Sequence, residues 1–195
     1  IVNFEKNLEK GIFNLIFNCA ELSAKQNVLI VAENAIFGWY DNLIANKVKN
    51  YCRKFQINTD FMVVEEPTGE ILTQIRNLSK DYDCIIYFSR LGDLQRFENI
   101  HLCKVVMSYA RNVEMMASEF GTTNFQMHLD LKNSIDELFS RSQKIKINCP
   151  LGTNLFGECS EIFSNKDDVS IRRFPMVVHS PISASTLSGT IAVSY

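Results

Sequence analysis

Up to Ala110 the chain alternates between amphipathic segments and short apolar runs. Apolar residues recur three and four positions apart in residues 4–23, 41–55 and 70–79, and this period predicts a helix in each. The apolar runs, typical of buried strands, are residues 28–32, 61–64, 84–88 and 104–107. Strands that alternate with helices at this spacing predict an α/β fold, a Rossmann-like parallel sheet flanked by helices.

After Ala110 the pattern changes to two further helices and then to short strands. We expect helices over 112–119 and 125–141 and strands over 144–148, 153–159 and 189–193. Residues 144–148 alternate strictly between polar and apolar side chains, and the Pro-Leu-Gly turn at 150–152 lets the next strand return antiparallel. The sequence therefore predicts a Rossmann-like domain over residues 1–142 and the start of an antiparallel α+β domain over 143–195, which we expect to be incomplete.

Charge and hydropathy limit the classes of molecule that we expect the protein to bind. The 195 residues carry 20 Lys and Arg against 22 Asp and Glu, so no basic excess exists to hold a nucleic acid. No apolar run reaches the ~18–20 residues of a membrane span, and the N-terminus lacks the layout of a signal peptide. We expect a cytoplasmic protein with no nucleic-acid and no membrane partner. Because the first residue is Ile1 rather than Met, we also expect a processed product or a fragment.

The six cysteines are expected to be buried free thiols in a reducing compartment. The sequence contains no Cys-x-x-Cys motif, and a chain of this length can bury a sufficient core without disulfides. The alternative is a disulfide between Cys149 and Cys159 across the predicted hairpin.

Histidines and arginines are the candidates for chemistry. His101, His128 and His179 belong to no His-Glu-x-x-His or His-x-His motif. His101 lies on a segment that connects to a predicted strand, where α/β folds can carry function, and is our candidate catalytic residue. Arg172 and Arg173 are candidates for binding an acidic substrate group, with two solvent-facing side chains as the alternative.

A nucleotide cofactor is not expected. The residues after the first predicted strand contain neither a Gly-x-Gly-x-x-Gly motif nor the lysine of a phosphate-binding loop. Glu33 at the same position would repel a phosphate.

Four short motifs follow one another in the second half of the chain. They are Lys-Ile-Lys-Ile at 144–147, Gly-Thr-Asn-Leu at 152–155, Phe-Pro at 174–175 and Gly-Thr-Ile at 189–191. Their order resembles that of the aminopeptidase T-like metallopeptidases and of the related 2,5-dihydroxypyridine dioxygenase-like proteins. The opening helix, the strand over 28–32 and the helices after Met107 are also similar to the N-terminal α/β domain of that family.

The resemblance implies a divergent or truncated member of a metal-dependent enzyme family. Its chemistry would be amide or peptide hydrolysis, or ring cleavage by a non-haem iron oxygenase. The resemblance also implies a small-molecule or peptide substrate, a bound divalent metal ion (iron, zinc or cobalt) and a homodimer. The family's aminopeptidases have an acidic metal ligand three residues after the proline, where this chain has Val178. His179 beside it is therefore the candidate metal ligand, and the remaining ligands would lie beyond Tyr195.

The alternative is a non-catalytic domain that uses the same scaffold to bind a small molecule or to assemble with another chain. The missing acidic ligand and the 14 phenylalanines favour this alternative, because aromatic residues are enriched at partner surfaces.

Overall fold

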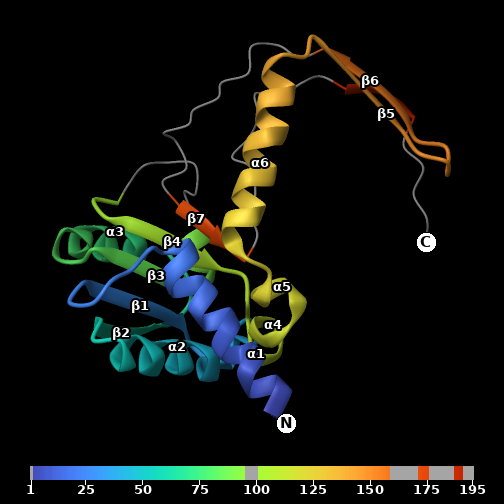
Figure 1. Ribbon diagram of the computed structural model, residues 1–195. Coiled ribbons are helices and arrows are strands. Elements are labelled where there is room, and N and C mark those ends of the chain that lie inside the picture. The colour runs from blue at the N-terminus through green and yellow to red at the C-terminus, as the bar shows by residue number, and fades with distance from the viewer. Residues whose placement is uncertain (1, 95–100, 159–170, 176–186, 191–195) are drawn as a thin grey trace. The chain divides into compact units, whose positions relative to one another are not determined.

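The chain forms two compact units, shown in Figure 1 as a computed structural model that describes residues 2–94, 101–158, 171–175 and 187–190. The first unit comprises Ile1–His128 and Asp167–Val178, and the second comprises Leu129–Lys166 and His179–Tyr195. The domain boundary expected after residue 142 stays a prediction.

The first unit is built on a five-stranded parallel sheet with the order β2-β1-β3-β4-β7. Its strands are β1 (Asn27–Glu33), β2 (Asn58–Val64), β3 (Cys84–Phe88), β4 (Lys104–Ser108) and β7 (Ile171–Phe174). All of β3, and all of β1 after Asn27, is buried, because both faces of the sheet are covered. The predicted α/β fold with a parallel sheet is therefore confirmed, and β7 adds a strand that we did not expect.

Helices connect these strands. They are α1 (Val2–Phe13), the π-helix η1 (Asn14–Cys19), the 3₁₀ helix η2 (Ala35–Phe37), α2 (Asn42–Lys54), α3 (Gly69–Leu78), the 3₁₀ helices η3 (Ser79–Asp81) and η4 (Arg90–Asp93), α4 (Val113–Ala117) and α5 (Glu119–Thr122). Side chains cap the N-termini of α2, α3 and α4: Asp41 accepts from the Ile44 amide at 3.0 Å, and Thr68 and Asn112 cap α3 and α4. Helix α2 packs on β1 and β2, whereas α1 packs against α4 and α5.

Helix α6 (Phe125–Ser140) leads into the second unit, which contains the antiparallel sheet β5-β6-β8. Strands β5 (Lys144–Asn148) and β6 (Asn154–Glu158) form the predicted hairpin, and β8 (Leu187–Thr190) pairs with β6. Gly152 has φ 111° in the hairpin turn and donates its amide to the Cys149 carbonyl at 2.9 Å. Residues 191–193 of the last predicted strand lie outside the described residues. Within the described part of the chain, no helix is both long and apolar enough to cross a membrane.

Candidate functional site

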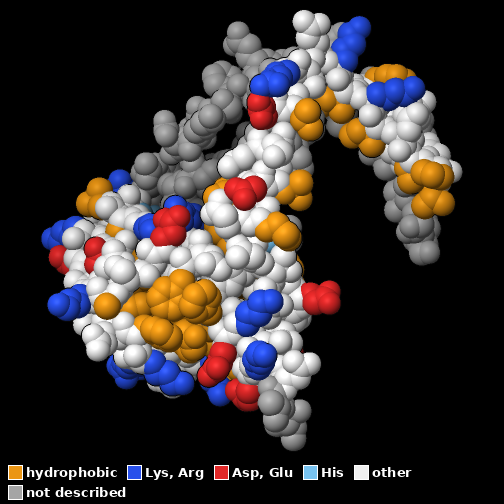
Figure 2. Space-filling model, in the orientation of Figure 1, with side chains coloured by type: hydrophobic (Ala, Val, Ile, Leu, Met, Phe, Trp, Pro, Cys, Tyr) orange, Lys and Arg blue, Asp and Glu red, His pale blue; other side chains and the backbone are white. Residues whose placement is uncertain are grey.

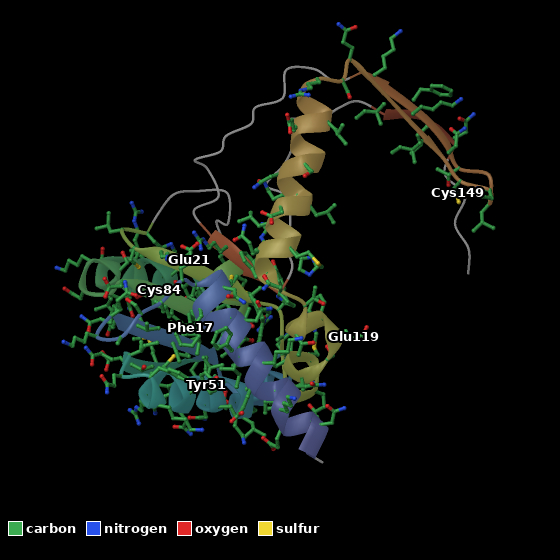
Figure 3. All side chains as sticks on the ribbon, in the orientation of Figure 1. Phe17, Glu21, Tyr51, Cys84, Glu119 and Cys149 are labelled. Carbon is green, nitrogen blue, oxygen red and sulfur yellow. The ribbon has the colours of Figure 1, made fainter. Side chains whose placement is uncertain are left out.

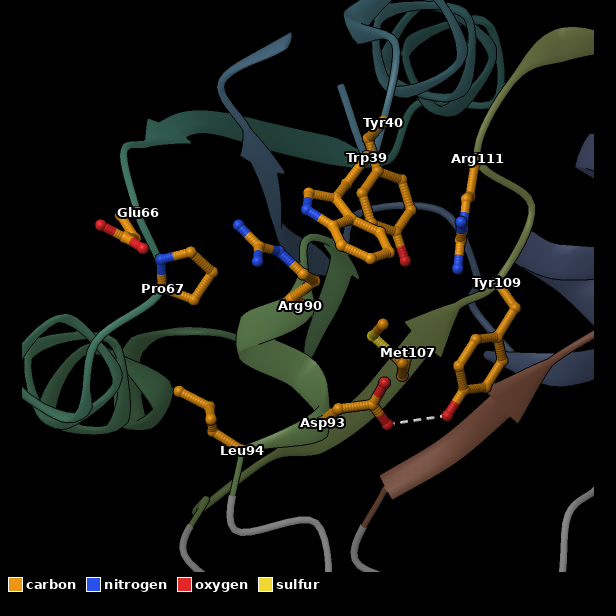
Figure 4. A pocket seen from close by; sticks show the side chains of 10 residues that line it. All are labelled: Trp39, Tyr40, Glu66, Pro67, Arg90, Asp93, Leu94, Met107, Tyr109 and Arg111. Atoms are coloured by element: carbon orange, nitrogen blue, oxygen red, sulfur yellow. Dashed lines mark hydrogen bonds between the residues drawn. The ribbon is translucent and has the colours of Figure 1, made fainter. Parts of the chain in front are cut away.

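A cavity of about 400 Å³ lies in the first unit, where the parallel strands end (Figure 4). The chain passes from β1 to β2 on one side and then to β3 on the other side of β1, so the direction of winding reverses between β1 and β3. Loops separate at such a reversal, and ligands of open α/β sheets bind there, outside the carboxyl ends of the strands. The volume is within the range of small-molecule sites, roughly 300–1,000 Å³.

The cavity is lined by segments that follow four strands. The lining residues are Trp39, Tyr40, Glu66, Pro67, Arg90, Asp93, Leu94, Met107, Tyr109 and Arg111. Trp39 and Tyr40 follow β1, Glu66 and Pro67 follow β2, and the remaining residues belong to the segments at and after the ends of β3 and β4. Aromatic rings, two arginines and two acids therefore meet in one place.

An ion pair between a fully buried carboxylate and a partly exposed arginine fixes one wall of this cavity. Glu33, the last residue of β1, is fully buried, and its Oε1 accepts from Arg90 Nε at 2.8 Å and pairs with Arg90 Nη2 at 2.6 Å. Its Oε2 accepts from the backbone amide of Arg90 at 2.9 Å. These hydrogen bonds raise the pKa of Arg90 above its ordinary value. The negative charge of Glu33, which we expected to repel a ligand phosphate, is thus matched by Arg90.

Two guanidinium groups lie over Trp39. The ring centroid is 4.9 Å from Cζ of Arg90 and 5.1 Å from Cζ of Arg111, and in Figure 4 the indole lies between them. Such contacts orient a guanidinium through the electron-rich face of the ring. Arg111 is exposed and, within the described ranges, makes no ion pair with a carboxylate. Trp39 is 42% exposed and is the only tryptophan of the chain.

Hydrogen-bonding groups complete the lining. The Tyr109 hydroxyl donates to Asp93 Oδ1 at 2.7 Å, the interaction drawn in Figure 4. The Tyr40 hydroxyl donates to the Ser108 carbonyl at 2.8 Å, and burial raises the pKa of Tyr40. Both phenols are therefore fixed by partners of the first unit, with their rings against the cavity.

The fold is similar to that of a solved dioxygenase. This protein is the 2,5-dihydroxypyridine dioxygenase from Pseudomonas putida KT2440; the match has a TM-score of 0.63 and 9% sequence identity, and it covers 88% of this chain. The chain spans 55% of the length of that protein. No protein-family model matches the sequence, and no curated protein matches it. At 9% identity the similarity concerns the fold alone.

That solved protein carries the name of the second of the two groups that the sequence motifs resemble, and what it shares with this chain is the fold. No family model and no curated protein supports the aminopeptidase T-like group.

The described residues do not provide a metal site. Among them, no group of three or more His, Cys, Asp or Glu side chains could hold a metal ion. His179, the candidate metal ligand, lies outside the described residues. Asp93 and Glu66 line the cavity without a histidine or cysteine beside them. The described residues that line the cavity therefore do not fit a metal centre.

His101 lies away from the cavity. It precedes β4, whereas the cavity lies where the strands end, and its side chain is 7% exposed. Its Nε2 lies 2.9 Å from the Tyr87 hydroxyl, and Nδ1 has no hydrogen-bond partner among the described residues. Burial, assisted by the charge of Arg76, lowers the pKa of His101 from 6.5 to about 4. The imidazole is therefore neutral at pH 7, and its role as a catalytic residue stays a prediction.

Arg172 and Arg173 occupy β7 and leave the sheet in opposite directions. Arg172 donates to the Cys19 carbonyl at 2.6 Å and pairs with Glu21 at 3.0 Å, so its guanidinium holds the end of η1 on the sheet. Lys104 contacts the same Glu21 at 3.2 Å, and the hydrogen bond from Arg172 is the main reason why the pKa of Glu21 is lowered. Arg173 is 7% exposed and is considered further below. Substrate binding by either arginine stays a prediction.

The five described cysteines are free thiols. Cys19, Cys52 and Cys84 are buried, and burial raises the pKa of Cys52 to about 11. Such thiols are poor nucleophiles at pH 7. Cys149 is exposed, and its suggested partner Cys159 lies outside the described residues, so that pairing stays a prediction.

An exposed aromatic cluster connects η1 with α2. Phe17 lies 4.8 Å from Phe13 and 5.1 Å from Phe55, and Tyr51 lies 5.0 Å from Phe55, measured between ring centroids. It forms the apolar patch on the face of the first unit in Figure 2, and Figure 3 labels Phe17 and Tyr51 within it. Nothing in the structure shows what covers this patch, so assembly with another chain stays a prediction.

Proposed function

We propose that the chain is a small-molecule-binding α/β domain, whose ligand occupies the cavity at the carboxyl ends of the strands. The observation that carries this proposal is the position of that cavity at the reversal between β1 and β3, with Trp39 in its wall. The exposed indole of Trp39 can stack on a planar organic molecule, and the fixed Arg90 gives the site a defined shape before binding.

The only tryptophan of the chain reports directly on this site. Because Trp39 lines the cavity, a ligand that enters must change the surroundings of its indole. We expect saturable quenching or a wavelength shift of tryptophan emission when the purified protein is titrated with small aromatic compounds. The Trp39→Phe variant should lose this signal while still being stabilised against heat by the same compound. A linear, unsaturable change with every compound would refute the proposal.

A second candidate function is that of a ring-cleaving, metal-dependent oxygenase, and the fold similarity favours it. In this reading the described residues form the scaffold and the aromatic cavity, and the metal ligands lie elsewhere in the protein. Metal analysis of the purified full-length protein, with turnover of dihydroxylated aromatic compounds and aminoacyl substrates, tests it. Turnover of the aromatic compounds that depends on added iron would support it. Absence of metal after reconstitution would contradict it.

A further inference from the structure

The charges around the cavity are not evenly matched. Arg90 is paired with the buried Glu33, and the exposed Glu66 acts on the same guanidinium. Arg111, by contrast, has no ion pair with any carboxylate in the described ranges. In Figure 4 Glu66 lies beside Pro67, on the other side of Arg90 from Arg111. The Arg111 side of the cavity therefore carries a positive charge without a carboxylate bound to it.

Arg173 adds a second unmatched charge behind the same wall. It is 7% exposed, and among the described residues its Nε has no hydrogen-bond partner and no carboxylate pairs with it. A guanidinium in a protein interior without an anionic partner costs folding free energy, and a bound anion would offset that cost.

The sheet register places Arg173 next to the cavity. Met107 of β4 is the register partner of Arg173 on β7, and laterally paired residues leave a sheet from the same face. Met107 lines the cavity, and a Cβ on Gly92 would collide with its Sδ, so η4 covers this face. The buried guanidinium therefore lies beside the Met107 wall, on the face that η4 covers.

We propose that the ligand is a small aromatic carboxylate, bound through its carboxylate by Arg111, with Arg173 supplying positive potential from behind Met107. This inference rests on the proposed function. A guanidinium presents a planar fork of donors that matches a carboxylate, and Trp39 and Tyr109 offer rings beside which an aromatic ligand can pack. The Asp93 carboxylate points toward Tyr109, whose hydroxyl donates to it (Figure 4).

Three probes of nearly equal shape and different charge test this inference. Benzoate, benzamide and benzylamine are titrated in turn against the intact chain, and the emission of Trp39 is followed. We expect benzoate to bind about tenfold or more tightly than benzamide, because only the anion gains from the arginines, and benzylamine to bind least. Added salt should weaken benzoate binding and leave benzamide binding nearly unchanged.

Variants assign the charge to its residues. Arg111→Gln should reduce the affinity for benzoate about tenfold and leave that for benzamide unchanged, and Arg111→Lys should restore part of the loss. The matched control is Arg53→Gln, because Arg53 is exposed on α2 and does not line the cavity. Arg53→Gln should leave both affinities unchanged.

Arg173 has a signature that a purely structural residue would not show. Arg173→Met removes a buried unmatched charge at nearly constant volume, so the unfolding midpoint should rise or stay constant while benzoate binding weakens several-fold. Arg173→Lys, which keeps the charge, should retain the preference for benzoate over benzamide. If Arg173→Met were less stable but kept the preference for benzoate over benzamide, Arg173 would have a structural role. Its proposed contribution to carboxylate binding would then be overturned.

The outcomes separate this inference from the proposed function. Equal, saturable binding of benzoate and benzamide, with no effect of Arg111→Gln, would overturn the carboxylate inference and leave the cavity as a ligand site. No saturable response of Trp39 to any of the three probes would overturn both. Tighter binding of benzylamine than of benzoate would show that Asp93 and Glu66 dominate, and would also overturn the carboxylate inference.

Discussion

Replacing Glu33 by Gln should lower the free energy of unfolding by about 1–3 kcal/mol, the usual cost of losing charge-assisted hydrogen bonds at a buried group, because the Arg90 side chain left behind is 35% exposed. The carboxylate is fully buried and accepts three hydrogen bonds from Arg90, through Nε, Nη2 and the backbone amide. A glutamine keeps the shape but offers one oxygen and turns two N–H donors toward the donors of Arg90. Chemical denaturation of both proteins measures the difference.

The matched control for this change is Glu66→Gln. Glu66 lines the same cavity but is exposed, so its substitution should change stability by no more than about 0.5 kcal/mol. If Glu33→Gln changed the free energy of unfolding as little as Glu66→Gln, the Glu33–Arg90 pair would not fix the cavity wall. The claim that the site has its shape before a ligand binds would then be contradicted.

The stability of the protein should fall as the pH is lowered from about 6.5 to about 4, partly because of His101. Burial lowers the pKa of His101 from 6.5 to about 4, so the folded state binds this proton less readily than the unfolded state. The stabilisation is complete above pH 6.5 and is lost as the pH falls through the folded-state pKa. The difference between the two pKa values corresponds to about 3 kcal/mol.

Two histidine variants isolate the contribution of His101, because other groups such as Glu21 also contribute stability that is lost in acid. His101→Leu should flatten the dependence of unfolding free energy on pH between about 4 and 6.5, when compared with the parent chain. His128→Gln, on α6, should keep the parent's dependence. If the unfolding free energy of His101→Leu depended on pH as it does in the parent chain, the imidazole would not be held neutral by burial next to Tyr87.

The sheet was predictable where its strands are apolar. The runs at 28–32, 61–64, 84–88 and 104–107 each correspond to a strand. In β1, β3 and β4 two covered faces demand apolar residues at nearly every position, whereas β2 lies at the edge of the sheet and is mostly exposed or half-buried. The hairpin of β5 and β6 was predictable for a different reason, since alternation and a Pro-Leu-Gly turn fix it locally.

Strand β7 was not predictable from its residues. Its sequence is Ile-Arg-Arg-Phe, and two adjacent charges argue against a strand beside β4. The structure accommodates them on opposite faces: Arg172 binds the Cys19 carbonyl and Glu21, and Arg173 is buried beside Met107. These partners lie 60 or more positions away in the sequence, so no local pattern indicates them.

The cavity was missed although a signal for it existed. The residues after the first strand lack the glycines and the lysine of a phosphate-binding loop, and the charge of Glu33 by itself predicts repulsion of a phosphate. Arg90, which neutralises it, follows β3 and is separated from Glu33 by 57 positions. The general signal was the polar and aromatic residues just after each predicted strand, since the carboxyl ends of parallel strands meet at one edge.

The central claim is that the cavity beside Trp39 is the ligand site of this protein, and one magnetic resonance signal tests it most directly. The chain has a single tryptophan, so its indole N–H gives one assignable resonance. We predict that benzoate shifts this resonance saturably, together with the backbone amides of Arg90 and Arg111. An unmoved indole resonance at benzoate concentrations that shift amides in another part of the chain would contradict the claim.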